Sequence, residues 1–158
     1  RRVGTAPFPL QEVAQDYEQT LSQNNLKPTL ETSDADRAAQ WLRQQVHGDI
    51  PPIPLNLSGA KLLGADALTK NGTLIGRLLY QTPKGLLALY MAPHRTQFSQ
   101  TKPTQIDGRA FYLAQPNPKT TLLAWEYNTV GMGMVAHLTL QETSPYALDA
   151  RRMTATLP

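Results

Sequence analysis

The sequence lacks cysteine altogether, and it lacks any long apolar run. Without cysteine the chain forms no disulfide, binds no metal through a thiolate and holds no cysteine nucleophile. No apolar stretch approaches the roughly 20 residues that a helix needs to cross a bilayer, and no signal-peptide pattern is present. Because the sequence begins at Arg1 without an initiating methionine, we expect a soluble fragment of a longer protein.

The charges are nearly balanced and are scattered along the chain. Fifteen basic residues against 12 acidic ones give a net charge of +3. A nucleic-acid interface needs basic clusters with interleaved aromatic residues, whereas the only basic doublets here, Arg1-Arg2 and Arg151-Arg152, are typical of solvated chain ends. We therefore expect no nucleic-acid partner. The length indicates a single domain, residues 1–158, with loose ends at residues 1–7 and 153–158.

Two helices are predicted in the N-terminal part. In residues 9–22, Pro9 fits the first helical turn and the apolar side chains fall on one face. In residues 34–47, Ser33 is a suitable N-cap, and Gly48 suits the left-handed end of a helix. The apolar stripe of this second helix consists of Ala38, Trp41, Leu42 and Val46. Trp41 is therefore predicted to be buried, and its replacement by alanine to cost about 3 to 5 kcal/mol.

The rest of the chain predicts antiparallel strands. Residues 61–68 and 74–81 flank Asn71-Gly72, the strongest short hairpin signal, because a type I′ turn needs two residues that tolerate positive φ. The prolines of residues 50–57 predict an extended crossing. Further strands are predicted at residues 85–92, 108–114, 120–127 and 130–139, and a short helix at residues 144–152.

These elements predict an α+β fold, with an antiparallel sheet of about six strands and the two N-terminal helices packed on one face. Gly131 and Gly133 alternate with methionine in the last predicted strand, which indicates a bulge or the close approach of another segment. The polar stretch at residues 94–107 is long for a compact domain, and loops of this length carry function or move.

No constellation of residues predicts catalysis. The three histidines, His47, His94 and His137, lack the close pairing that zinc ligands show. The chain also lacks a nucleophile elbow, a phosphate-binding glycine loop and a dinucleotide fingerprint. We therefore expect a protein that is not an enzyme and that uses no cofactor or metal.

The order of motifs resembles the extracytoplasmic region of membrane-anchored bacterial anti-sigma factors, the regulators of extracytoplasmic-function sigma factors. The resemblance runs from a Ser-Asp helix start through an aromatic in the helix, prolines, a Gly-x-x-Leu-x-Gly strand and a strand ending in Tyr. These positions are Ser33, Asp34, Trp41, Pro52, Pro54, Leu57, Gly59, Leu63, Gly64 and Tyr80. It extends more weakly to Met91-Ala92-Pro93 and Trp125, and the chain departs from the family where Ala65 and Asp66 replace a glycine and a basic residue.

The resemblance implies a sensor or interaction domain at the periplasmic face of the inner membrane, which relays an envelope signal to a sigma-binding domain outside this sequence. Residues 9–22 would then be a juxtamembrane-type helix. The implied partners are an envelope protein or a regulatory protease, with a homo-oligomer also open. Two alternatives remain, namely a generic envelope interaction or assembly module and a small enzyme with an unrecognised site.

The loop at residues 94–107 is the predicted place of partner contact. It is the longest irregular stretch between predicted strands, so it can change conformation without dismantling the core. The hypothesis assigns the contact to Arg95, Gln97, Phe98 and Lys102, with Phe98 as the one apolar anchor in a polar surround.

Overall fold

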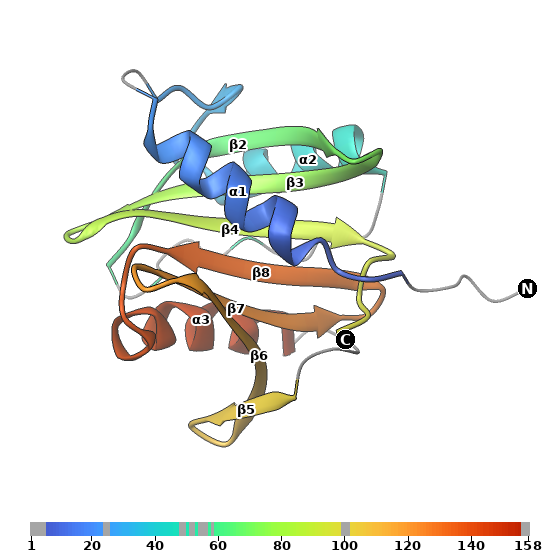
Figure 1. Cartoon of the computed structure of the whole chain (residues 1–158). Helices are drawn as coiled ribbons and strands as arrows, with labels where there is room; N and C mark the ends of the chain where they lie inside the picture. Colours follow the sequence, from blue (N-terminus) through green and yellow to red (C-terminus); the bar gives the residue numbers. More distant parts are fainter. Residues whose placement is uncertain are drawn as a thin grey trace, which may run out of the picture.

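The computed structural model describes residues 6–23, 26–47, 50, 53, 57, 59–98 and 102–155. These residues form three helices and one antiparallel sheet of eight strands (Figure 1). In chain order the elements are α1 (Leu10–Leu21), β1 (Leu30–Glu31), α2 (Ala35–Val46), β2 (Lys61–Lys70), β3 (Thr73–Thr82), β4 (Gly85–Pro93), β5 (Pro103–Ile106), β6 (Arg109–Asn117), β7 (Thr120–Tyr127), β8 (Val130–Ala136) and α3 (Leu140–Ala155). The α+β class with an antiparallel sheet is as predicted.

The sheet consists of two meanders joined in the middle. Its strand order is β1-β2-β3-β4-β8-β7-β6-β5, so β4 and β8 meet at the joint. The hairpin at Asn71-Gly72 has φ values of 51° and 76° at its two turn residues, as a type I′ turn requires. The sequence prediction of about six strands missed β1 and β5, which have only 2 and 4 residues.

The helices cover opposite faces of the sheet, which corrects the prediction that the two N-terminal helices share one face. Figure 1 shows α1 in front of the strands and α2 and α3 behind them. One core joins the sheet to α2 and α3, and a second core joins it to α1. Along β3, Leu78 and Tyr80 belong to the first core, whereas Ile75 and Leu79 belong to the second. Both faces of this strand are apolar, so each face needs a cover.

The second helix begins and ends one residue away from the predicted caps. Asp34 replaces Ser33 as the N-cap, because its carboxylate accepts hydrogen bonds from the backbone N–H groups of Asp36 and Arg37 at 3.0 and 3.3 Å. His47 takes the left-handed conformation that was predicted for Gly48, with a φ of 52°. Most of the predicted extended crossing at residues 50–57, and Gly48 itself, lie outside the described residues.

The predicted burial of Trp41 is borne out only in part. This side chain is only partly buried and lies at the flank of the stripe through which Ala38, Leu42 and Val46 contact the sheet. At the C-terminus, α3 begins earlier than predicted, and β8 ends at Ala136. No helix in the described part of the chain is long and apolar enough to cross a membrane.

Candidate functional site

Helix α1 is docked on the sheet through polar groups as well as apolar ones. Val13 and Tyr17 are fully buried in the second core. The Tyr17 hydroxyl donates a hydrogen bond to the carbonyl of Leu86 at 2.7 Å and accepts one from the backbone N–H of His137 at 3.1 Å. One side chain of α1 thereby links the two meanders of the sheet.

Beside Tyr17 lies a buried ion cluster, which we define as Asp16, Asp66, Lys70, Arg77 and Tyr90. The Arg77 guanidinium donates to Asp16 Oδ2 at 2.7 Å and to Asp66 Oδ2 at 2.8 Å. Lys70 Nζ lies 2.9 Å from Asp16 Oδ1, and the Tyr90 hydroxyl donates to Asp16 Oδ2 at 2.7 Å. Two carboxylates thus balance two cations, as burial of charge requires.

The electrostatics of the cluster favour the charged forms of Asp16 and Arg77. Burial raises the pKa of Asp16, but the hydrogen bonds from Tyr90 and Lys70 and the charge of Arg77 outweigh it, so that pKa lies below its ordinary value of 3.8. The pKa of Arg77 is raised, because its pairing with Asp66 and Asp16 outweighs the cost of burial. The cluster is therefore a set of fixed charges that tie α1 to β2, β3 and β4.

The segment before α1 is held by the loop after β4. Residues 6–8 form a parallel bridge with this loop, in which Phe8 donates to the carbonyl of Gln97 at 3.0 Å and Gln97 donates to the carbonyl of Ala6 at 3.1 Å. The Phe8 ring lies over Gly131 and Gly133 of β8, where a Cβ would come within 2.5 and 2.8 Å of ring atoms. The close approach that these glycines predicted is thus the approach of Phe8.

The first part of the predicted contact loop, residues 94–98, is held by these interactions, and residues 99–101 lie outside the described residues. Phe98 is buried, with its ring stacked on Tyr112 at a centroid distance of 4.3 Å, so its predicted role as an exposed anchor is wrong. Gln97 and Lys102 are exposed and Arg95 is partly exposed, and a partner contact by these three residues stays a prediction. The second half of the predicted loop contains β5.

We expect Gly131→Ala to destabilise the protein by about 1 to 3 kcal/mol, the usual cost of overpacking. The new Cβ would lie 2.2 Å from the Arg95 carbonyl oxygen and 2.5 Å from the Phe8 ring, so the N-terminal segment and the loop must move apart. Urea unfolding would measure the loss of unfolding free energy. Hydrogen exchange at the backbone N–H of Phe8 would show whether the loss lies in the bridge between residues 6–8 and the loop. The control is Gly76→Ala, whose Cβ meets only the ends of the Leu42 and Val46 side chains, at 3.2 and 3.6 Å. Equal unfolding free energies for Gly131→Ala and Gly76→Ala would contradict the close packing of Phe8 and Arg95 on Gly131.

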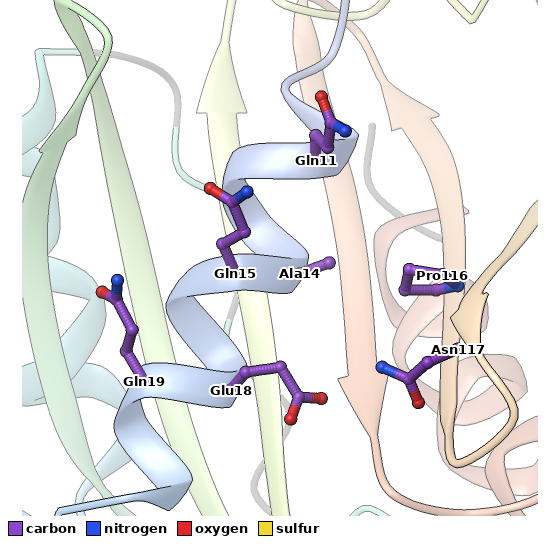
Figure 2. A pocket seen from close by; sticks show the side chains of 7 residues that line it. All are labelled: Gln11, Ala14, Gln15, Glu18, Gln19, Pro116 and Asn117. Carbon is purple, nitrogen blue, oxygen red and sulfur yellow. The ribbon is translucent and has the colours of Figure 1, made fainter.

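A groove runs along the other flank of α1, between this helix and β6. It consists of two adjoining hollows of about 560 and 410 Å³. We call it the α1–β6 groove, and it is lined by Leu10, Gln11, Ala14, Gln15, Glu18, Gln19, Ala114, Gln115, Pro116, Asn117 and Leu122. Figure 2 shows Ala14 and Glu18 pointing from the helix toward Pro116 and Asn117.

The outer wall of the groove is a β-bulge. The pairing of β6 with β7 shifts between Ala114 and Asn117, so that Gln115 and Pro116 together oppose Thr121. A bulge bends its strand and turns side chains away from the regular pleat. Gln115 and Pro116 are both exposed and both line the groove.

The two ends of the groove differ in chemistry. Leu10, Ala14, Ala114 and Leu122 make one end apolar. At the other end Glu18 accepts a hydrogen bond from the Thr120 hydroxyl at 2.7 Å, and His137 Nε2 lies 2.6 Å from the same carboxylate oxygen. Burial raises the pKa of Glu18, but these hydrogen bonds outweigh it and the pKa is lowered, so Glu18 is an anion at neutral pH.

The histidines do not gather at one place. Within the described residues no group of three or more His, Asp or Glu side chains could hold a metal ion. His137 pairs with Glu18, and His47 and His94 are exposed. Sequence reasoning missed both the buried ion cluster and the groove. The position of Arg77 inside an apolar strand could have indicated the ion cluster.

Comparison with protein-family models, with curated proteins and with solved structures finds no match for this chain.

Proposed function

We propose that the chain is the extracytoplasmic sensor or interaction domain of a transmembrane anti-sigma factor. It would be a non-enzymatic domain at the periplasmic face of the inner membrane, where it relays an envelope signal to a cytoplasmic sigma-binding domain. The motif order that resembles this family supports the proposal. So does the manner in which the helix expected next to the membrane is attached to the sheet.

The observation that carries the proposal is the docking of α1 by the buried ion cluster. Buried ion pairs contribute little net stability, because desolvation offsets their attraction, but they fix one geometry. A helix held in this manner has one defined docked position, to which the ion pairs themselves add little net stability. Such an element suits a relay between a membrane anchor and a sensing domain, since a signal acts by shifting the balance between two states.

The proposal is tested in the full-length protein. Its gene is expected to encode a cytoplasmic segment and one membrane span before residue 1. A reporter gene under a promoter of the sigma factor encoded beside it would measure release. Asp16→Asn, which removes a charge from the buried ion cluster, is expected to change reporter output severalfold, and Asp36→Asn on the exposed start of α2 is expected to leave it unchanged.

A gene without a membrane span would overturn the proposal. An unchanged reporter after deletion of residues 6–155 from the anchored protein would overturn it too. If Asp16→Asn and Asp36→Asn changed the reporter equally, the docking of α1 would not be the relay.

A further inference from the structure

We infer that residues 6–8 form a releasable strap over the loop at residues 94–98, and that this strap opens while α1 stays docked on the sheet. The closed structure would then open in two steps, of which the first uncovers Phe98. This inference goes beyond the proposed function, because it concerns the segment before α1 and does not depend on a membrane anchor. It rests on which groups hold the strap and which groups hold the helix.

The strap and the loop pair with each other through their backbones. Ala6 donates to the carbonyl of His94 at 2.9 Å, and Phe8 donates to the carbonyl of Gln97 at 3.0 Å. The N–H of Gln97 donates back to the carbonyl of Ala6 at 3.1 Å, so both backbone polar groups of Gln97 pair with the strap. Gln97 is exposed, and water can therefore replace these hydrogen bonds when the strap moves away.

Phe8 is the large apolar side chain of the strap. It is 5% exposed, and its ring packs over Gly131 and Gly133 and lies 5.3 Å from the ring of Phe98 between centroids. The ring of Phe98 stacks on Tyr112 as well, and Phe98 is 7% exposed. When Phe8 moves away, Phe98 loses one of the two aromatic rings that it contacts, and it becomes accessible to solvent.

The polar anchors of α1 are separate from those of the strap. Asp16 holds the helix through the buried ion cluster, and Tyr17 holds it through its hydrogen bonds with Leu86 and His137. These anchors connect α1 to the sheet and not to residues 6–8 or 94–98. A segment with few buried contacts opens at a lower free energy than an element with many. The strap is therefore expected to open before α1.

Opening of the strap changes what the loop can offer to a partner. In the closed state Phe98 is covered and the backbone of Gln97 is paired. In the open state both become available beside Arg95, which is already partly exposed. The partner contact that the sequence predicts for this loop would thus depend on the strap. In a chain with the proposed function, tension from the membrane side would reach residues 6–8 before it reaches α1.

Native-state hydrogen exchange, measured by NMR on the 158-residue chain, tests the inference. The amides of Phe8 and Gln97 report on the strap, because each donates across the bridge between strap and loop. The amide of His137 reports on the docking of α1, because it donates to the Tyr17 hydroxyl. In the unmodified chain, Phe8 and Gln97 are expected to share one protection factor, which is lower than that of His137.

Phe8→Ala is expected to accelerate exchange at Gln97 by about tenfold or more and to leave exchange at His137 unchanged. Gly131→Ala acts from the other side, since its Cβ would lie 2.5 Å from the Phe8 ring, and it is expected to accelerate exchange at Phe8 and Gln97 together. The control is Leu42→Ala, which truncates a fully buried side chain of α2 in the first core and is expected to leave exchange at Gln97 unchanged.

Thermal melts would confirm that the three variants are folded. Equal acceleration at Gln97 and His137 in Phe8→Ala would mean that strap and helix open as one unit, and it would overturn the inference. So would an unchanged exchange rate at Gln97 in both Phe8→Ala and Gly131→Ala. Acceleration at Gln97 by Leu42→Ala as large as that by Phe8→Ala would also overturn it. None of these readouts requires a membrane anchor or a sigma factor, so the strap and the proposed function can fail separately.

Discussion

Replacing Arg77 with methionine is expected to destabilise the protein by about 3 to 5 kcal/mol at neutral pH, the usual cost of breaking a buried ion pair from one side. Arg77 donates to Asp16 and to Asp66, whose side chains are 6% and 8% exposed. Without the guanidinium, two buried carboxylates would face each other with Lys70 as the remaining cation of the buried ion cluster. Urea unfolding at pH 7 measures the effect.

The pH dependence of this variant separates lost charge pairing from lost packing. The folded-state pKa of Asp16 is below its ordinary 3.8, so its pairing contributes stability above that pH, which is lost as the pH falls through the folded value. In the Arg77→Met variant the Asp16 carboxylate is easier to protonate, because it no longer faces the positive charge of Arg77. The difference in unfolding free energy between the two proteins is therefore expected to shrink below about pH 4.

Two further variants control this experiment. Arg37→Met alters an exposed arginine on α2 and is expected to change stability by less than about 0.5 kcal/mol. Adding Asp66→Asn to Arg77→Met removes one of the two buried carboxylates that have lost their arginine partner. The double variant is therefore expected to recover part of the lost unfolding free energy. If the difference in unfolding free energy between Arg77→Met and the unmodified chain stayed constant from pH 7 to pH 3, the loss would come from packing and not from charge pairing.

The ion pair of Asp66 and Arg77 in the buried ion cluster could have been predicted from the sequence. A two-residue turn at Asn71-Gly72 fixes the register of the whole hairpin, and it places Asp66 directly opposite Arg77. An acidic and a basic residue at facing positions inside two apolar strands predict an ion pair. The third member, Asp16, comes from a helix far away in the chain, and no local pattern places that helix over the hairpin.

The side of the sheet that each helix covers could not be predicted for a related reason. Strands β3, β4 and β8 are buried on both faces, so their apolar pattern does not mark one face as the core. The apolar stripes of α1 and α2 predict that each helix packs on the sheet, but they do not predict on which of its two faces. Only the packing of the whole sheet decides this.

The α1–β6 groove was beyond sequence reasoning because a bulge creates it. The extra residue in β6 falls at Gln115 and Pro116, and proline in a strand is compatible with a bulge, an edge or an end. The Phe8 contact was predicted in part, since Gly131 and Gly133 indicated a bulge or the close approach of another segment. The identity of that segment depends on the loop at residues 94–98, which bonds to residues 6–8 across a long separation in sequence.

The two tryptophans offer the second large effect, because the structure buries them to different extents. Trp125 is 1% exposed, and its ring meets Phe111 edge to face at a centroid distance of 5.8 Å. Trp41 packs against the same core but is only partly buried. The sheet strand β7 places Trp125 under α3, whereas Trp41 stands at the flank of α2.

Trp125→Ala is therefore expected to cost about 3 to 5 kcal/mol of unfolding free energy, the range for deleting a fully buried large aromatic. Trp41→Ala is expected to cost less than half as much, because a partly buried side chain loses less apolar area on truncation. Urea unfolding of both variants under one set of conditions compares them directly. A larger loss of stability in Trp41→Ala than in Trp125→Ala would contradict the packing described for α2.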